Sequence, residues 1–306
     1  MTRVNILTIH QEATRRLLRQ TAKLGEDKKT ALWKGLSFVF NQLVQPNDIV
    51  VIYDYPPKDI QVKVASRRQV MHIATEPWDR YPPEFIKQFG MVLSCHPKPA
   101  DYDGVWINYH GCLDWYYGMR KSNNKMQITL DWTGLSYSPT KTNQRVSIIT
   151  SKLSGLPGHK ARNHFIDILQ TSDIPLDIFG QGRQEIHDKI DGLFHYPYHI
   201  ALENSFKNDY WTEKLADGLL AECIVFYAGC QNIEKYFDKG SIIMLDINNP
   251  TAAVDIIKKT MADNLWYKQQ AVIKANKKKL MMEENIYPVV LRFLLENKFL
   301  TITART

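Results

Sequence analysis

The sequence predicts an α/β fold made of two domains, and three observations support this prediction. The chain has 306 residues, which at ~150 residues per domain is enough for two domains. Short apolar runs alternate with longer helical patterns, as in sheets of mainly parallel strands. The alternation stops at a polar stretch over residues 122–144 and then starts again. We therefore expect a first domain over residues 1–135 and a second domain over residues 136–306.

The first half contains four runs that predict buried strands, because each is rich in Val, Ile, Leu or Met and is bounded by polar residues. These runs cover residues 3–9, 48–55, 69–75 and 90–96. Ligands of open α/β sheets bind at the carboxyl ends of the strands. Glu76 directly follows the run over 69–75, and Cys95 and His96 end the run over 90–96, so these three are candidate site residues. His72 lies inside a run, where a packed core histidine is the simpler interpretation.

The second half repeats this pattern with five predicted strands and three predicted helices. The strands cover residues 145–151, 176–180, 198–203, 223–229 and 241–247, and the helices cover 156–170, 209–222 and 251–270. By the same rule, the residues that end the strands are candidates for ligand binding. They are Ser151, Gly180, Glu203 and Gly229.

Residues 201–222, ALENSFKNDYWTEKLADGLLAE, form the most informative segment. A strand should end at Glu203 and Asn204, and a polar turn should lead to a helix that Asp209 caps. The positive end of that helix dipole suits a phosphate. Glu213 and Lys214 on the first turns could bind a sugar hydroxyl and a phosphate. A capped amphipathic helix with a solvated Glu and Lys remains an equally open interpretation.

Two further side chains suggest chemistry. Arg162 lies near the start of the helix predicted over 159–170, where its guanidinium could hold a diphosphate in a bidentate manner, although an arginine there is more often a surface residue. Glu76 precedes Pro77, which favours extended backbone at the strand end. Its carboxylate could act as a general base, and the alternative is a solvated strand-end residue.

Composition and charge exclude several classes of protein. No apolar run reaches the ~18 residues of a membrane span, and the amino-terminal segment lacks the pattern of a cleaved signal peptide. The four cysteines form no C-x-x-C pair, so we expect reduced thiols and a cytoplasmic protein. There is no G-x-G-x-x-G or Walker A loop. The net charge of +7 suits nucleic acid, an anionic membrane or a phosphorylated substrate.

The order of these segments resembles the α-1,3/4-fucosyltransferases of glycosyltransferase family 10. That family carries AFENS-x-x-x-DY-x-TEKL followed by a strand A-G-x-V-P-V-x-x-G. Here the corresponding segments are ALENSFKNDYWTEKL (201–215) and AECIVFYAG (221–229), with Glu222 in place of the usual Gly and Val225 in place of the usual Pro. The preceding blocks SIITS (147–151), ARNHFIDIL (161–169) and LDIFGQG (176–182) also match. ATEP (74–77) and FGMVLSCHP (89–97) match more weakly, so the resemblance covers about residues 69–247.

This resemblance implies a GT-B enzyme, in which two Rossmann-like domains face a cleft. The implied reaction is inverting transfer of L-fucose from GDP-fucose to a hydroxyl of a glycan acceptor, such as lipopolysaccharide or another surface glycan, with no metal or other cofactor required. Glu76 would be the general base of the acceptor domain. The donor-binding residues that the resemblance implies are Arg162, Lys214, Glu213, Asn204, Tyr210, Ser205, Ser151 and Gly180.

Other functions remain open at this point. The same fold could use a different nucleotide sugar, or could be a non-catalytic module that binds a nucleotide sugar or a glycan. Nucleic acid is not expected as a partner, because the sequence shows no RNA-binding motif. The basic run KANKKKL (274–280) lies on a helical stretch, and such faces are usually solvated. With its apolar neighbours Leu265, Trp266, Val272 and Ile273, the stretch over 264–281 could instead contact the inner membrane surface peripherally.

Overall fold

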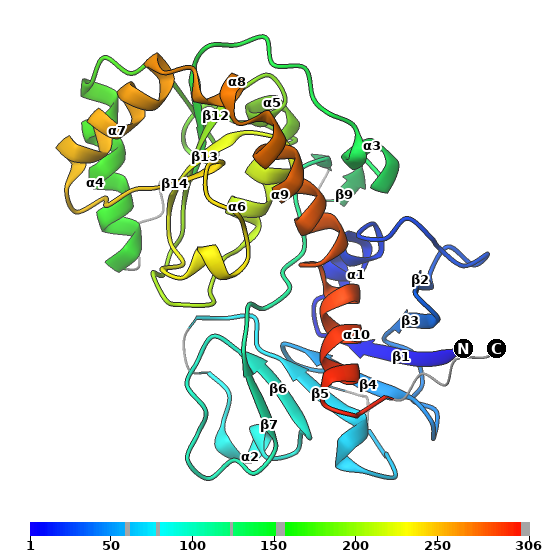
Figure 1. Ribbon diagram of the computed structural model, residues 1–306. Coiled ribbons are helices and arrows are strands. Elements are labelled where there is room, and N and C mark those ends of the chain that lie inside the picture. Colours follow the sequence, from blue (N-terminus) through cyan, green and yellow to red (C-terminus); the bar gives the residue numbers. More distant parts are fainter. Residues whose placement is uncertain (59–61, 78–79, 123–124, 151–156, 301–306) are drawn as a thin grey trace. The chain divides into compact units, whose positions relative to one another are not determined.

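The chain packs into two compact units, each built around its own sheet (Figure 1). The computed structural model describes residues 1–300 except 59–61, 78–79, 123–124 and 151–156. The first unit combines residues 1–114 with the chain from Met282 onward, and the second unit is Trp115–Met281. The division therefore falls after Asp114, whereas the sequence predicts a boundary at residue 135.

The first unit contains a seven-stranded sheet in the order β2-β3-β1-β4-β5-β6-β7. All neighbouring strands are parallel except β2 and β3. Because β3 and β4 pair with opposite sides of β1, the winding of the chain reverses between β1 and β4. Such a switch point is where open α/β sheets bind ligands. The strands are β1 (Thr2–Leu7), β2 (Ala31–Trp33), β3 (Leu36–Phe40), β4 (Ile49–Tyr53), β5 (Val70–Ile73), β6 (Met91–Ser94) and β7 (Val105–Asn108).

The carboxyl-terminal helix belongs to the first unit because its apolar face completes that unit's core. Tyr287 of α10 is fully buried against Trp33 and Phe38, and its hydroxyl donates to the Leu17 carbonyl oxygen at 2.8 Å. No local sequence pattern reports such a long-range contact, so the sequence assigns this helix to the second domain. The helices of the unit are α1 (Gln11–Leu18), η1 (Arg67–Gln69), α2 (Pro83–Ile86) and α10 (Ile286–Glu296).

The second unit contains a five-stranded parallel sheet in the order β11-β10-β12-β13-β14. Here the switch point lies between β10 and β12. The side chains of Ile148, Ile200 and Phe226 form the centre of its core. Its strands are β10 (Val146–Ile149), β11 (Leu176–Phe179), β12 (Tyr198–Leu202), β13 (Ile224–Ala228) and β14 (Ile242–Met244), with a separate hairpin of β8 (Met119–Ser122) and β9 (Lys125–Ile128).

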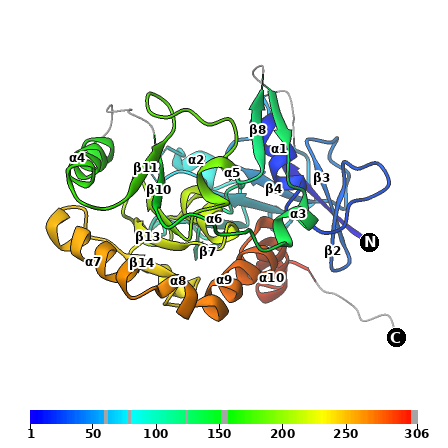
Figure 2. The ribbon, with the colours of Figure 1, turned by 90° about the horizontal axis from the view of Figure 1, so that it is seen from above.

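Helices cover the second sheet, and α4 and α7 lie side by side (Figure 2). The sequence predicts a single helix over 251–270, but the helix is interrupted at Asn264, which has a left-handed φ of 50°. The helices are α3 (Trp132–Ser136), α4 (Pro157–Thr171), α5 (Ile190–Leu193), α6 (Glu213–Leu220), η2 (Ile233–Lys235), α7 (Pro250–Ala262), α8 (Leu265–Lys268) and α9 (Gln270–Met282).

The two sheets, parallel apart from the β2–β3 pair, confirm the predicted α/β class with two Rossmann-like domains. All nine strands predicted from apolar runs are present, shortened by one to four residues. The sequence missed β2, β3, β7 and the β8–β9 hairpin. Across the described residues, no helix combines the length and the apolar character needed to cross a bilayer.

Candidate functional site

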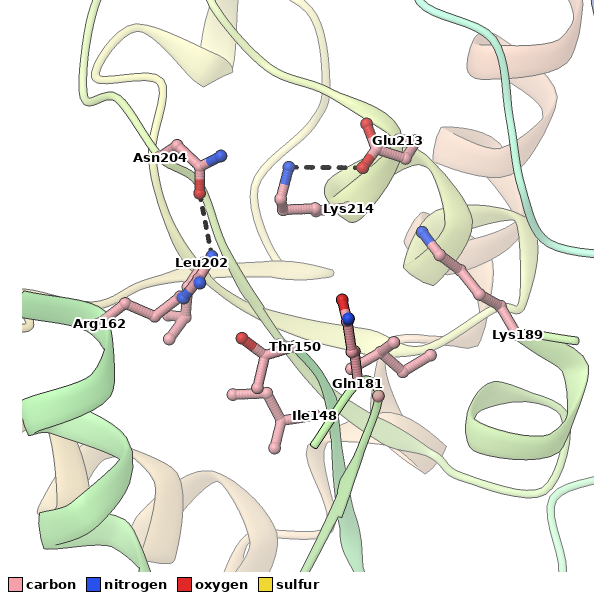
Figure 3. A pocket seen from close by; sticks show the side chains of 11 residues that line it. Ile148, Thr150, Arg162, Gln181, Lys189, Leu202, Asn204, Glu213 and Lys214 are labelled. Atoms are coloured by element: carbon pink, nitrogen blue, oxygen red, sulfur yellow. Dashed lines mark hydrogen bonds and ion pairs between the residues drawn. The ribbon is translucent and has the colours of Figure 1, made fainter. Parts of the chain in front are cut away.

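A cavity of about 280 Å³ lies at the carboxyl edge of the second sheet (Figure 3). Thr150 follows β10, Gly180 follows β11, and Leu202 and Asn204 come from the end of β12. The cavity therefore lies at the switch point between β10 and β12, the place where this topology binds ligands.

Gly180 allows two strand ends to meet at the cavity wall. Its φ is 120°, and a Cβ atom built there would lie 2.1 Å from the Thr150 carbonyl oxygen. Any other residue would separate the ends of β10 and β11. A glycine at this position thus shapes the cavity.

Arg162 of α4 contributes a buried positive charge to the cavity. Its side chain points toward the end of β12, where Nη1 donates to Asn204 Oδ1 at 2.9 Å (Figure 3). Burial, together with the nearby Arg183, lowers the pKa of Arg162. A cation that is desolvated beside a second cation is suited to an anionic ligand, since the ligand would relieve both effects.

Lys214 contributes the second cation from the first turn of α6. Its Nζ lies 3.4 Å from a carboxylate oxygen of Glu213 and 3.4 Å from one of the fully buried Glu203. Thr212 completes the group: its Oγ accepts from the Lys214 backbone N–H and donates to Glu203. The ammonium group is therefore fixed in position before any ligand binds.

The charges of this group depend on one another. Burial opposes the charge of Lys214, but Glu213 and Glu203 outweigh it and raise the pKa of Lys214. Burial likewise opposes ionisation of Glu213, but Lys214 and Lys189 lower its pKa to about 2. Burial raises the pKa of Glu203 despite Lys214 and Thr212. At neutral pH, Lys214 and Glu213 are both charged.

The predicted cap of this helix is wrong. α6 begins at Glu213, with Thr212 as its N-cap, and Asp209 lies three residues earlier with a left-handed φ of 59°. The Asp209 carboxylate instead accepts from Lys235, Asn232 and Tyr236 around η2. These three donors compete successfully with the helix amides for the carboxylate.

The cavity brings together five of the eight predicted donor-binding residues: Arg162, Gly180, Asn204, Glu213 and Lys214. Tyr210 is buried and Ser205 is half-buried, and neither lines the cavity. Ser151 lies outside the described residues.

Lys189 is a cavity residue that the sequence did not reveal. It precedes α5, far from any predicted strand end, and its Nζ lies 2.6 Å from the buried Asp217. The packing of α5 against β10 brings it to the cavity, where it points inward (Figure 3). Gln181 also lines the cavity and follows the predicted strand over 176–180, so the strand-end rule could have found it. Thr150 lines the cavity too, but it lies inside the strand predicted over 145–151 and follows only the shorter β10 of the structure.

A second and larger cavity, of about 740 Å³, shares Gly180 and Gln181 with the first. Arg120, Lys121 and Ser122 of β8 line one side, and residues 185–187 line the other. The Lys121 backbone N–H donates to the His187 carbonyl oxygen at 2.8 Å, which holds the two sides together. The two cavities therefore adjoin at Gly180 and Gln181.

Glu76, the predicted general base, lies in the first unit after β5. Its side chain is 33% exposed, and Oε1 lies 3.7 Å from Arg80 Nη1. Its backbone carbonyl oxygen is 3.4 Å from His96 Nε2 and 3.8 Å from Cys95 Sγ, so all three predicted residues of this edge are neighbours. Within the described part of the chain, no group of three His, Cys, Asp or Glu side chains could hold a metal ion.

Known proteins resemble this chain in sequence and in fold. A fucosyltransferase-like protein of Arabidopsis thaliana is 28% identical over 102 residues, and the match covers 32% of this chain and 20% of that protein. The chain thus matches about a fifth of the length of this curated relative.

Solved structures also resemble it. A crystal structure of an α1,3-fucosyltransferase with GDP-fucose has 15% identity and a TM-score of 0.49, covering 94% of this chain and 92% of that one. A DNA-modifying β-glucosyltransferase has 10% identity and a TM-score of 0.47, covering 96% and 100%.

The family comparison falls on the unit that contains the cavity. Residues 140–287 match the model described as glycosyltransferase family 10 (fucosyltransferase) C-term. This range contains the cavity residues from Ile148 to Lys214. Residues 140–287 of this chain are therefore similar to the carboxyl-terminal part of glycosyltransferase family 10, the fucosyltransferase family.

Proposed function

We propose that this chain is an inverting glycosyltransferase that moves L-fucose from GDP-fucose to a hydroxyl of a glycan acceptor. One observation supports this proposal most strongly: Arg162 and Lys214 line one cavity at the switch point of the domain that matches family 10. Two fixed cations suit a diphosphate, and the adjoining cavity of about 740 Å³ offers room for the rest of the donor.

In the proposed reaction, the cavity stabilises the leaving group. Negative charge grows on the diphosphate as the bond to the sugar breaks, and Arg162, Lys214 and the amino end of α6 would stabilise it. One preorganised donor of this kind contributes about 3–4 kcal/mol. Because these groups supply positive charge, we propose that the transfer requires no bound metal, and that a chelator leaves the rate unchanged.

Glu76 is the proposed general base. It would accept the proton of the acceptor hydroxyl while that oxygen forms the new bond to the sugar and GDP departs. A positioned base contributes about 10²–10⁴-fold to the rate. This assignment is supported by the match of ATEP to the family pattern and by the position of Glu76 at a strand end.

The test is incubation of the full chain with GDP-fucose and a panel of acceptors containing N-acetylglucosamine, with GDP release as the readout. Glu76→Gln should keep GDP binding and lose transfer by about 10²-fold or more. Arg162→Ala should lose both. Glu84→Gln, which removes an exposed carboxylate of α2, is the matched control. Transfer by Glu76→Gln at the wild-type rate would contradict the base assignment.

The same experiment separates the alternatives. If the donor is a different nucleotide sugar, mass spectrometry of the products would detect transfer from that nucleotide sugar instead of from GDP-fucose. Binding of GDP-fucose without GDP release, for every acceptor tested, would indicate a non-catalytic module. Lipopolysaccharide and other surface glycans are the acceptors that we propose to test first.

A peripheral membrane contact is a separate part of the proposal. Leu265, Trp266 and Ile273 pack against the core of the second unit, so they are not available to lipid. Exposed Lys268, Lys274 and Lys278 remain on α8 and α9 and could contact anionic headgroups.

Vesicle sedimentation tests this contact. Replacing Lys268, Lys274 and Lys278 by Gln should weaken binding to vesicles that contain phosphatidylglycerol, at about 1 kcal/mol per lysine. Replacing the exposed Lys23, Lys28 and Lys29 of the first unit is the control. Equal binding of both triple variants would rule out this surface.

A further inference from the structure

A network of polar side chains lies at the switch point of the first sheet. His10 follows β1, Asp54 follows β4, and Glu76 and Arg80 follow β5. β1 and β4 are the two strands between which the winding reverses. The carboxyl edge of the first sheet is thus the counterpart of the edge that carries the donor cavity in the second unit.

Asp54 is the centre of this network. Its side chain is fully buried, and its backbone has a left-handed φ of 65°, which is uncommon for a residue other than glycine. Arg80 Nη2 donates to both carboxylate oxygens at 2.8 and 2.6 Å, and Tyr81 Oη donates at 2.7 Å. His10 Nε2 lies 2.6 Å from the same carboxylate. Burial and the neighbouring Asp54 raise the pKa of Tyr81, so its hydroxyl remains a donor.

Arg80 connects this buried carboxylate to Glu76. One terminal nitrogen is bonded to Asp54, and the other lies 3.7 Å from Glu76 Oε1. The guanidinium also lies over the rings of Tyr55 and Tyr81, at 5.2 and 5.7 Å from their centroids. These contacts restrict the rotation of Arg80, so its free end has a defined position beside Glu76.

Other titratable groups face Glu76 from the neighbouring strand. Cys95 and His96, which follow β6, contact its backbone carbonyl oxygen rather than its carboxylate in these interactions. His10 lies on the other side of Asp54 and is 47% exposed. Arg80 forms an ion pair with the Glu76 carboxylate, at 3.7 Å between Nη1 and Oε1.

We propose that Arg80, anchored by the buried Asp54, is a positioning residue that orients Glu76 and keeps its carboxylate ionised, so that it can accept a proton at neutral pH and below. This inference rests on the proposed role of Glu76 as the base. A guanidinium at this distance favours the charged form of a carboxyl group, and its planar geometry fixes the direction of the carboxylate. Only the acceptor side of the reaction depends on it.

The proposal predicts a change in pH dependence rather than a uniform loss of activity. Without the cation, Glu76 takes up a proton at a higher pH. The acidic limb of kcat/KM for the acceptor should therefore move upward by about one pH unit in Arg80→Gln. The affinity for GDP-fucose should be unchanged. Arg80→Lys keeps the charge and should leave the limb close to its wild-type position.

The experiment measures kcat/KM from pH 4.5 to 9, with circular dichroism at each pH to confirm that the protein is folded. Arg80→Gln leaves the buried Asp54 with fewer donors and could impair folding. Asp54→Asn combined with Arg80→Gln removes the buried charge together with its partner, so this double variant gives the same test. Arg67→Gln, which breaks the surface pair with Asp103, is the matched control and should leave the limb in place.

The outcomes are distinguishable. An upward shift in both Arg80→Gln backgrounds, with none in Arg80→Lys or Arg67→Gln, supports the proposal. An unshifted limb in both backgrounds overturns the role of Arg80 while leaving the transferase function intact. Loss of the limb in His10→Gln would overturn it as well, because the limb would then belong to the imidazole. If the wild-type chain transfers no sugar, the proposed function fails and this inference fails with it.

Discussion

At the scale of single residues, Lys189 shows how a buried carboxylate prepares a cation for a ligand. Asp217 accepts from Lys189 Nζ at 2.6 Å and from the backbone N–H groups of Tyr116 and Tyr117 at 2.9 Å. The ammonium group also lies 5.2 Å from the centroid of the Tyr116 ring. Lys189 is therefore directed into the cavity without having to be ordered by the ligand, which reduces the entropic cost of binding.

We expect Lys189→Met to weaken the binding of GDP-fucose about tenfold, because a charge-assisted contact of about 1.5 kcal/mol is lost. Isothermal titration calorimetry measures this effect. Lys258→Met is the control, since Lys258 forms an exposed pair with Asp173. Unchanged affinity in Lys189→Met would show that this cation does not contact the donor.

His72 illustrates the cost of burying a histidine. The sequence suggested a packed core residue, and the structure confirms it: the ring is fully buried and stacks on Phe89 at 4.8 Å. Nε2 lies 2.9 Å from the Asp54 carbonyl oxygen, so this nitrogen carries a hydrogen and donates there. Burial lowers the pKa of His72 from 6.5 to about 4, although Asp54 acts in the opposite direction.

This shift predicts a loss of stability in acid. Between pH 6.5 and 4 the unfolded chain binds a proton at His72 and the folded chain does not, so the free energy of unfolding falls as the pH falls. The full effect is about 3 kcal/mol. His72→Gln should reduce the difference between urea unfolding at pH 7.5 and at pH 4.5, whereas exposed His164→Gln should not. An equally steep loss in His72→Gln would contradict this account.

At the scale of elements, one buried ion pair joins α9 to the turn between α6 and β13. Glu222 has a left-handed φ of 55° and accepts from Lys277 at 2.9 Å and from Ser138 at 2.8 Å. Glycine, which the family usually has here, adopts such a φ without strain. Lys277 belongs to the basic run that suggested a solvated face, yet it is buried and forms this pair.

The pair predicts strong coupling between two substitutions. Glu222→Gly relieves the backbone strain but leaves the Lys277 ammonium buried without its carboxylate, so we expect a loss of about 3 kcal/mol. Lys277→Met should cost a similar amount. The double variant should cost at least ~1 kcal/mol less than the sum, as measured by urea unfolding. Additive losses would show that the two side chains do not act as a pair.

The elements also show what a sequence can reveal. Interior parallel strands such as β4 and β13 are buried throughout, so their continuous apolar runs predict them directly. Edge strand β2 is three residues long, and the polar β8–β9 hairpin lacks a buried apolar run, so neither gives a signal. The prediction that Asp209 caps α6 was wrong because the donors that bind its carboxylate lie around η2, more than twenty residues away in sequence. The Lys189–Asp217 and Asp54–Arg80 contacts also join residues that are more than twenty positions apart, so no local sequence pattern predicts them.

At the scale of the whole molecule, the core of the first unit is completed by α10, which comes last among the described helices in the sequence. The side chain of Tyr287 is fully buried, and its ring centroid lies 6.1 Å from that of Trp33 and 4.9 Å from that of Phe38. In the sequence, the residues that complete this core are thus separated from β1 by all of Trp115–Met281, which form the second unit. The first unit cannot reach its final packing until the whole chain is available.

This arrangement predicts that a destabilising substitution in α10 also destabilises the strands and helix near the start of the sequence. Tyr287→Ala should destabilise the first unit by about 3 kcal/mol, because it removes a buried aromatic side chain and leaves a cavity. Tyr287→Phe, which loses only the hydrogen bond to Leu17, should cost about 1 kcal/mol. Hydrogen exchange followed by mass spectrometry resolves the effect along the chain. In Tyr287→Ala, peptides from β1, β3 and α1 should exchange faster, while peptides from β10, β12 and β13 should exchange at the wild-type rate. Faster exchange confined to the second unit would show that α10 stabilises that unit instead.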